Sequence, residues 1–342
     1  MRRWLYLVLM MASMAFPNMA LAQSKAGATA PKSEAAATDI VVVTNDLLAD
    51  LVRQLGGEGF RIHVLLNSGD DSETYMPSQE TVKIVSQAKL VVIQGLGTER
   101  RWLNNLLNNA RYNGIVVNAT VNLPRLMTEN GTMVPAKIDL EKKTDYQGQK
   151  LDRRAWMDPS NIRVYIRNIT EGLAAADTAQ ANIYRTRANE IIKSLANLDA
   201  WARQSFGGIG KEYRRVVVSF DRFQYFAKAY GMEIIPLSDK KDNLLPQAEL
   251  QALKERMDKY YIRGIVIQSD AARAPLEAFA KSAGASLFGP VTTENIRELG
   301  KDRSGYDAMM REIMTAMYQA MVSNSGVAKP GPSGTQPRAY RR

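Results

Sequence analysis

The sequence predicts an α/β protein of two Rossmann-like lobes, each with a small, mostly parallel sheet flanked by helices, joined by one long spine helix. In both halves of the 342-residue chain, short apolar runs that are typical of buried strands alternate with segments of helical periodicity. Between the halves, residues 177–206 carry one apolar stripe at helical spacing. With 45% apolar and 23% charged residues, the chain has the composition of a folded soluble protein.

The two ends of the chain fall outside the predicted lobes. Residues 1–22 have a positively charged start, a short apolar stretch and a small-x-small site at Ala20–Ala22, the pattern of a cleavable signal peptide, so we expect export to the periplasm. Residues 23–38 predict a flexible leader, and the Pro/Gly-rich residues 325–342 predict a disordered basic tail. The chain has no cysteine, which excludes disulfides, thiolate metal sites and a lipid-anchored cysteine.

The N-terminal lobe, residues 39–176, is predicted from apolar runs that are separated by helices. This order predicts parallel strands with right-handed crossovers. The strands are expected at 40–43, 62–66, 90–93 and 115–117, with helices at 47–55 and 102–107. Residues 121–152 are rich in Pro, Gly, Asn and charge and predict a surface excursion.

Two helix starts follow the predicted surface excursion. Asp158-Pro159 combines a side-chain acceptor at the N-cap with proline at the first helical position. Asp177 and Gln180 have the spacing of a capping box, which places the start of the linking helix, residues 177–206, at Asp177.

The C-terminal lobe, residues 207–324, repeats the pattern of the first. Strands are expected at 216–218, 234–235, 265–267 and 287–288, with helices at 223–230, 246–258, 275–283 and 303–323.

Charge and histidine content narrow the functional classes. The chain has 45 Lys and Arg against 35 Asp and Glu, a net charge of +10, but no arginine-rich run, so we expect no nucleic-acid partner. Its single histidine, His63, lies in a predicted strand with its side chain opposite to those of Ile62 and Val64. One such histidine permits neither a Ser-His-Asp arrangement nor a metalloprotease motif, and no glycine-rich phosphate loop is present. The sequence therefore predicts no enzyme.

Five short segments, in order and at matching spacing over about residues 40–325, resemble a known family, the zinc- and manganese-type solute-binding receptors of ABC importers. They are Leu48-Ala49-Asp50-Leu51, Thr74-Tyr75-Met76-Pro77, Gly95-Leu96-Gly97, Trp156-Met157-Asp158-Pro159-Ser160-Asn161 and Ser219-Phe220-Asp221-Arg222-Phe223-Gln224-Tyr225-Phe226. The resemblance implies a two-lobed fold, a metal site in the cleft between the lobes, and an inner-membrane ABC permease as partner.

Carrying the family's metal ligands onto this chain removes most of the donor set. The family uses three histidines and one carboxylate, and the histidine positions correspond here to Glu73, Arg154 and Phe220. The carboxylate position falls near Glu294. A phenyl ring has no donor atom, and a guanidinium is a permanent cation that repels a divalent ion. We therefore expect a degenerate metal site and no cofactor, with zinc or manganese the alternative if this inference is wrong.

The altered site has two interpretations. A salt bridge between Glu73 and Arg154 would pin the lobes together. Alternatively, Arg154 grips a carboxylate or phosphate of an organic solute or a metal chelate, between apolar walls of Tyr75, Trp156 and Phe220. The candidate cleft residues are Glu73, Tyr75, Arg154, Trp156, Phe220, Asp221 and Glu294.

Two functions remain open at this point. The chain is predicted to be the periplasmic receptor of a metal-type ABC importer, for a solute that the sequence does not identify. The alternative is an accessory protein that kept the fold but left transport. In either role we expect a monomer.

Overall fold

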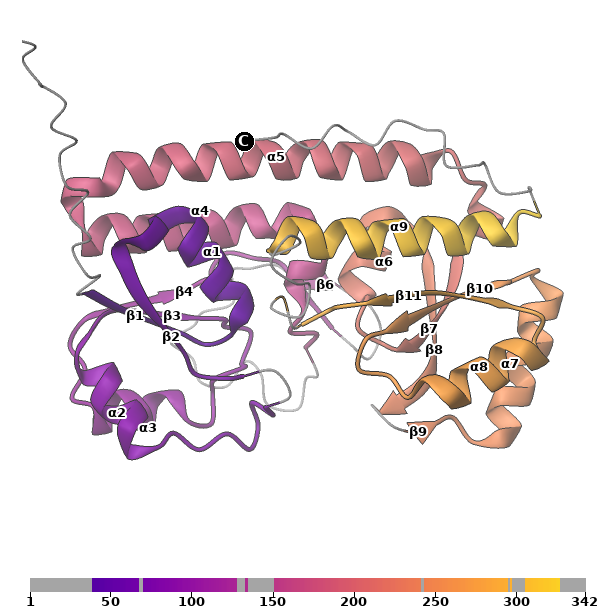
Figure 1. Ribbon diagram of the computed structural model, residues 1–342, viewed down its shortest axis with the longest axis horizontal. Helices are drawn as coiled ribbons and strands as arrows, with labels where there is room; N and C mark the ends of the chain where they lie inside the picture. Colours follow the sequence, from indigo (N-terminus) through magenta and orange to yellow (C-terminus); the bar gives the residue numbers. More distant parts are fainter. Residues whose placement is uncertain are drawn as a thin grey trace, which may run out of the picture. The chain divides into compact units, whose positions relative to one another are not determined.

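The computed structural model describes residues 39–67, 70–127, 133–134, 151–240, 243–294, 296 and 305–326 (Figure 1). The chain divides into two units, residues 1–36 and 37–342, and every described residue belongs to the second. The predicted signal peptide 1–22, the leader 23–38 and the tail beyond residue 326 lie outside the described residues. None of the helices in the described part combines the length and apolar character that a membrane span requires.

The first sheet is fully parallel, with strand order β2-β1-β3-β4. Its strands are β1 (Asp39–Val43), β2 (Phe60–Val64), β3 (Ala88–Ile93) and β4 (Ile115–Asn118). Side chains alternate between the two faces because a strand has a period of two. Val41 and Val43 pack on the side of α1 (Asp46–Gly56) and α4 (Pro159–Ala176), whereas Ile40 and Val42 pack on the opposite side. The predicted parallel strands of this lobe are confirmed.

That opposite side is covered by α2 (Gln79–Ser86) and α3 (Leu103–Asn109), as Figure 1 shows below the first sheet. Helix α2 was not predicted. Its N-cap is Ser78, whose side chain accepts a hydrogen bond from the Thr81 backbone N–H. The short 3-10 helix η1 (Gly57–Gly59) follows α1, and the strands β5 (Arg125–Leu126) and β6 (Met133–Val134) pair within the predicted surface excursion.

The predicted start of α4 is confirmed, because Asp158 accepts a hydrogen bond from the Ser160 backbone N–H and Pro159 occupies the first turn. The predicted capping box at Asp177 is wrong. Asp177 ends α4, where its backbone N–H donates to the Leu173 carbonyl, and its carboxylate accepts from the Tyr184 hydroxyl at 2.8 Å. The 3-10 helices η2 (Ala155–Met157) and η3 (Thr178–Gln180) flank α4.

The long helix α5 (Ala181–Gly207) therefore begins four residues after Asp177. It contacts α1 and α4 of the first lobe and α6 (Gln224–Tyr230) and α9 (Tyr306–Asn324) beyond it (Figure 1). Near its start, Arg187 Nη1 donates to the Leu55 carbonyl at 2.9 Å, and near its end the Phe206 ring packs edge-on to Phe226. The helix thus carries core residues from both halves of the chain.

The second sheet has strand order β11-β10-β7-β8-β9, parallel except for its edge strand β9. Its strands are β7 (Arg215–Phe220), β8 (Glu233–Lys240), β9 (Asn243–Leu244), β10 (Gly264–Gln268) and β11 (Ser286–Val291). Val216 and Val218 face the side of α9, whereas Val217 faces α7 (Gln247–Lys259) and α8 (Arg273–Ser282). The 3-10 helix η4 (Lys211–Tyr213) precedes β7.

The predicted fold class is confirmed: two α/β lobes with mostly parallel sheets, flanked by helices, with one long helix. The boundaries 39–176, 177–206 and 207–324 stay a prediction. One hydrophobic cluster contains residues of both sheets and of α5 and α9, so the described part has a core that the two halves share.

Candidate functional site

A cavity of about 580 Å³ lies at the carboxyl ends of the parallel strands β1, β2 and β3. This edge is where ligands bind in open α/β sheets. The loops after the three strands contribute Asn45, Asn67 and Gln94, and the segment before α4 contributes Trp156. The charged lining residues are Asp46, Asp70, Asp71, Arg100, Asp152, Arg153, Arg154 and Glu294. The cavity therefore contains side chains of both signs.

Glu99 fixes the loops that form one wall of the cavity. The Thr44 hydroxyl donates to its carboxylate at 2.6 Å, which ties the end of β1 to the loop after β3. The backbone N–H groups of Gln94 and Gly95 donate to the same carboxylate at 2.7 and 3.1 Å. Burial raises the pKa of Glu99, and these hydrogen bonds oppose the rise. Gly95 has φ +79°, and a Cβ atom there would lie 2.2 Å from Asn118 Oδ1, so only glycine fits.

The first group of charges, here called the Arg154 cluster, consists of Arg154, Asp152, Asp221, Arg222 and Glu294. Arg154 Nε donates to Glu294 Oε1 at 2.8 Å, and the Arg154 backbone N–H donates to Asp152 Oδ1 at 2.8 Å. Burial acts to lower the pKa of Arg154, but the charges of Glu294 and Asp152 outweigh it and raise that pKa. Burial raises the pKa of Asp152, which is 5% exposed, and the charges of Asp221 and Glu294 add to the rise.

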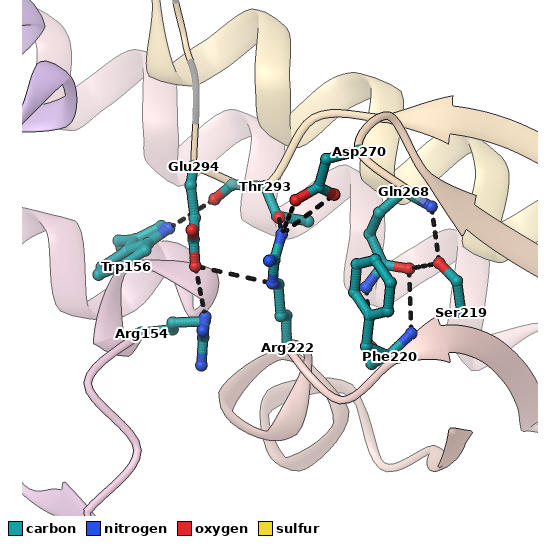
Figure 2. Close-up of polar contacts among 9 residues, drawn as sticks. All are labelled: Arg154, Trp156, Ser219, Phe220, Arg222, Gln268, Asp270, Thr293 and Glu294. Atoms are coloured by element: carbon teal, nitrogen blue, oxygen red, sulfur yellow. Dashed lines mark hydrogen bonds and ion pairs between the residues drawn. The ribbon is translucent and has the colours of Figure 1, made fainter. Parts of the chain in front are cut away.

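Arg222 extends this cluster into the second lobe (Figure 2). Its Nη1 donates to Asp270 Oδ2 at 3.1 Å and to the Thr293 hydroxyl at 3.1 Å. Its Nε lies 3.7 Å from Glu294 Oε1, so Glu294 lies between the guanidinium groups of Arg154 and Arg222. The Arg222 guanidinium also lies over the Phe220 ring, 4.8 Å from its centroid.

Phe220 is held at the end of β7 by the backbone and is a core side chain, 6% exposed. Gln268 Nε2 donates to the Phe220 carbonyl at 2.7 Å, and the Ser219 hydroxyl donates to Gln268 Oε1. These bonds join the ends of β7 and β10 (Figure 2). The phenyl ring thus packs under Arg222 and offers no ligand atom to the cavity.

The second group of charges, here called the Glu73 cluster, consists of Glu73, Arg100, Arg101 and Arg153. Glu73 Oε1 accepts from Arg153 Nη2, while its Oε2 lies 2.6 Å from Arg101 Nε and 3.6 Å from Arg100 Nη2. Burial acts to raise the pKa of Glu73, but Arg153 and the two other arginines outweigh it and lower that pKa. Three guanidinium groups here share one carboxylate.

The predicted salt bridge between Glu73 and Arg154 is wrong, because Glu73 pairs with Arg153 and Arg154 pairs with Glu294. Arg153 and Arg154 are adjacent, but they lie where the backbone enters the 3-10 helix η2. Their side chains therefore point in different directions and contact different clusters. Trp156 lies beside them, and its indole N–H donates to the Thr293 carbonyl at 3.1 Å.

Of the seven candidate cleft residues, Arg154, Trp156 and Glu294 line the cavity. Glu73 and Tyr75 do not. The Tyr75 ring packs against Trp102 at 4.9 Å between centroids, so Tyr75 is a partly buried side chain that contacts the core beside α3. Asp221 also lies off the lining; its carboxylate accepts from Gln224 Nε2 at 2.7 Å.

Sequence reasoning missed Asp152, Arg153, Arg100 and Arg222. Asp152 and Arg153 directly precede Arg154, so the charged run Asp152-Arg153-Arg154 was the available signal. Arg222 lies inside the segment 219–226 that carries the family resemblance, just after the end of β7 and next to Asp221. No local signal marks Arg100, because its role depends on a contact with Glu73 across 27 positions.

The donor chemistry of the cavity does not fit a transition-metal ion. Zinc and manganese sites are built from imidazole, thiolate and carboxylate ligands that converge on one point. Among the described residues, no three such side chains come together in a way that could hold a metal ion. His63 lies in β2, outside the lining of the cavity. A guanidinium group, that of Arg154, lies among the carboxylates instead.

Two mostly parallel α/β sheets bridged by a long helix make up a fold that this chain shares with periplasmic metal-binding proteins of known structure. The chain is similar to the Mn-bound periplasmic metal binding protein of Candidatus Liberibacter asiaticus, with a TM-score of 0.66 and 19% identity over 83% of this chain and 99% of that chain. It is also similar to the periplasmic zinc binding protein TroA of Treponema pallidum, with a TM-score of 0.64, 20% identity and the same coverage.

Residues 41–320 match the family described as zinc-uptake complex component A, periplasmic, and the chain belongs to this family. It is 28% identical over 275 residues to the manganese ABC transporter substrate-binding lipoprotein PsaA of Streptococcus pneumoniae, covering 79% of this chain and 85% of that protein. It is 27% identical to the iron ABC transporter substrate-binding lipoprotein MtsA of Streptococcus pyogenes serotype M1, with the same coverage. The predicted family is confirmed, and the chain is a solute-binding protein of metal-type ABC importers, not an enzyme.

Proposed function

We propose that this chain is a periplasmic solute receptor whose cargo is an organic anion or a metal chelate, and not a bare transition-metal ion. One observation carries the proposal. The guanidinium of Arg154 donates at 2.8 Å to the carboxylate of Glu294. The family resemblance implies that Arg154 falls at a histidine-ligand position and Glu294 near the carboxylate position.

Arg154 acts in this proposal as an internal cation. Its charge neutralises carboxylates that would otherwise face one another, and its pKa is raised by them, so it stays protonated at every physiological pH. A divalent ion entering the same place would have to displace Arg154 from Glu294 and then accept a permanent positive charge beside it. Coulomb repulsion between like charges opposes such a state strongly at low effective dielectric constant.

The size of the cavity supports an organic cargo. Its volume of about 580 Å³ lies inside the range of roughly 300–1,000 Å³ that is usual for small-molecule sites. Trp156 and four leucines, Leu47, Leu66, Leu96 and Leu151, supply apolar lining, and Asn45 and Gln94 supply neutral polar groups. Such a mixture suits a molecule with a carbon skeleton and a few polar groups.

The proposal includes the cellular setting. The predicted signal peptide, residues 1–22, would be removed on export, and the mature receptor would act as a monomer in the periplasm. Its partners would be an inner-membrane permease and the associated ATPase, in keeping with its ABC transporter relatives.

Native mass spectrometry of the mature protein, purified from the periplasm without added ligand, tests the proposal. We expect a bound species that carries organic mass and is released by denaturation, with or without a metal inside it. Stoichiometric zinc or manganese with no organic component would contradict the proposal. A control preparation that is unfolded, dialysed and refolded should lose the extra mass.

A further inference from the structure

We propose that the oxyanion group of the cargo, a carboxylate or a phosphate, binds to Arg100 and Arg153 of the Glu73 cluster and not to Arg154. This inference rests on the proposed function, because it assumes an anionic cargo in the same cavity. Both arginines line that cavity, together with Ser72 of the loop after β2.

The charge balance of the Glu73 cluster favours an anion. Three guanidinium groups converge on the single carboxylate of Glu73, which leaves two positive charges without a counter-charge inside the cluster. The side chains of Arg153 and Glu73 are 31% and 28% exposed, so water screens their charges only in part. Guanidinium groups bind carboxylate and phosphate through paired, charge-assisted hydrogen bonds.

Arg100 has the greatest capacity left for a ligand. Its Nη2 lies 3.6 Å from Glu73 Oε2, which is an ion-pair distance but too long for a good hydrogen bond. Its side chain is 52% exposed and lines the cavity. Arg153 is more firmly placed, because Nη1 donates to the Ser72 hydroxyl at 3.1 Å and Nη2 donates to Glu73. The Arg153 guanidinium is thus held in place by two hydrogen bonds, whereas the Arg100 guanidinium retains N–H groups that can donate to a ligand.

Arg154 is poorly suited to the same task. Its Nε already donates to Glu294, and the negative charges of Asp152 and Asp221 also act on it. Around Arg154 and Arg222, the carboxylates of Glu294 and Asp270 pair directly with the two guanidinium groups, and the charges of Asp152 and Asp221 add to theirs, so four carboxylates face two guanidinium groups. An incoming oxyanion would meet this negative excess, whereas at Arg100 and Arg153 it would meet a positive excess.

Two further carboxylates line the cavity near this wall, those of Asp70 and Asp71. Both residues are exposed, so solvent screens their charges. Each carboxylate accepts a backbone N–H within its own loop, Asp70 from Asn67 at 2.8 Å and Asp71 from Glu73 at 2.9 Å. These contacts shape the loop that presents Ser72 and Glu73 to the arginines.

Arg101 provides a matched control, because it contacts the same carboxylate but does not line the cavity. The variants Arg100→Gln, Arg153→Gln and Arg101→Gln each remove one charge from the cluster. Binding of inorganic phosphate and of citrate to the full mature chain would be measured by calorimetry and by the shift in melting temperature. Phosphate and citrate together distinguish a phosphate-bearing from a carboxylate-bearing cargo.

We expect R100Q and R153Q to weaken binding of the preferred oxyanion at least about tenfold, the loss of one charge-assisted hydrogen bond pair. R101Q should weaken it less than about threefold, through screened long-range charge alone. Arg100→Lys should restore part of the affinity of R100Q. Circular dichroism and melting of the free variants establish that each one is folded.

Equal losses in R100Q and R101Q, or no loss in R100Q and R153Q, would overturn the subsite while leaving an anion-binding receptor in place. A wild-type chain that binds neither phosphate nor citrate at millimolar concentration would also overturn it. The proposed function has a separate outcome, because bare zinc or manganese in the purified protein contradicts that function whatever the arginine variants do.

Discussion

The two ion-pair clusters of the cavity are opposite in charge. In the Arg154 cluster a guanidinium lies among carboxylates, and in the Glu73 cluster a carboxylate lies among guanidinium groups. The first joins the segment before α4 to Glu294 after β11, whereas the second stays within the N-terminal half of the chain. The cavity region therefore has separated charges, with carboxylates in excess in one cluster and guanidinium groups in excess in the other.

The two clusters also differ in how burial affects the pKa of a carboxylate. Burial dominates at Asp152 and raises its pKa, whereas at Glu73 the surrounding arginines outweigh burial and lower the pKa. The ionised carboxylate of Asp152 therefore destabilises the fold, whereas the ionised carboxylate of Glu73 stabilises it.

Removal of the least exposed arginine of the two clusters should have the largest effect. The Arg222 side chain is 14% exposed and pairs with Asp270, Thr293 and Glu294. We expect Arg222→Ala to lower the free energy of unfolding by about 3 kcal/mol, because it leaves partly buried carboxylates with less compensation. Urea denaturation measures the change, and Arg222→Lys serves as the charge-preserving control. A loss below about 0.5 kcal/mol, the size expected for a surface pair, would show that the Arg154 cluster contributes no more than exposed ions do.

Arg154→Ala should cost about 2 kcal/mol, less than Arg222→Ala because the Arg154 and Glu294 side chains are 31% and 45% exposed. A double-mutant cycle with Glu294→Gln isolates the direct interaction, and we expect a coupling energy of about 1 kcal/mol. Additive single effects would mean that the two residues do not support each other, and the role of Arg154 as internal cation would then fail.

The pH dependence of stability should have opposite signs in the two clusters. The folded-state pKa of Glu73 is below its ordinary value of 4.5, so Glu73 stabilises the fold above pH 4.5, and this contribution is lost as pH falls through the lowered pKa. The folded-state pKa of Asp152 is above its ordinary value of 3.8, so its ionisation destabilises the fold as pH rises from 3.8 through the raised pKa.

Glu73→Gln and Asp152→Asn separate these contributions. Melting temperatures between pH 3 and pH 7, at constant ionic strength, should show a smaller loss on acidification for E73Q than for the wild type. In the wild type, protonation of Asp152 on acidification stabilises the fold. D152N lacks this gain, so its melting temperature should fall more steeply than that of the wild type as pH is lowered. The same slope in all three proteins would contradict the assignment of these pKa shifts.

The smallest effect is expected at Arg101. Its side chain is 60% exposed, and its pair with Glu73 at 2.6 Å is one of three that Glu73 makes. Exposed ion pairs contribute little, so Arg101→Gln should change the free energy of unfolding by less than about 0.5 kcal/mol. A loss approaching that of R154A, measured in the same denaturation series, would remove the distinction between the two clusters.

Most of the fold could be predicted from local patterns. The apolar runs of β1 and β7 and the Asp158-Pro159 helix start carry their structural information in adjacent residues. Helix α2 escaped prediction because it has eight residues and buries only Thr81 and Val85, too few for a recognisable stripe. The capping box at Asp177 was predicted wrongly because an acidic residue shortly before a helix has the sequence pattern of an N-cap. In the structure Asp177 is instead the C-cap of the preceding helix, α4.

The sequence predicted the approximate location of the site but not the ion pairs within it. The sequence indicated that Glu73, Arg154 and Glu294 belong near one cleft, because they fall on aligned positions. It did not indicate partners, since the choice between Arg153 and Arg154 depends on how the backbone turns into η2. Pairs such as Arg154 with Glu294, 140 positions apart, are fixed by the tertiary fold and leave no local trace in the sequence.

Calorimetric titration of the ligand-stripped mature protein with zinc and with manganese decides whether the cavity holds a bare ion. Under the proposed function the guanidinium of Arg154 occupies the place of the cation, so we expect no stoichiometric binding tighter than about 1 µM for either ion. A one-to-one isotherm with a sub-micromolar dissociation constant would contradict it.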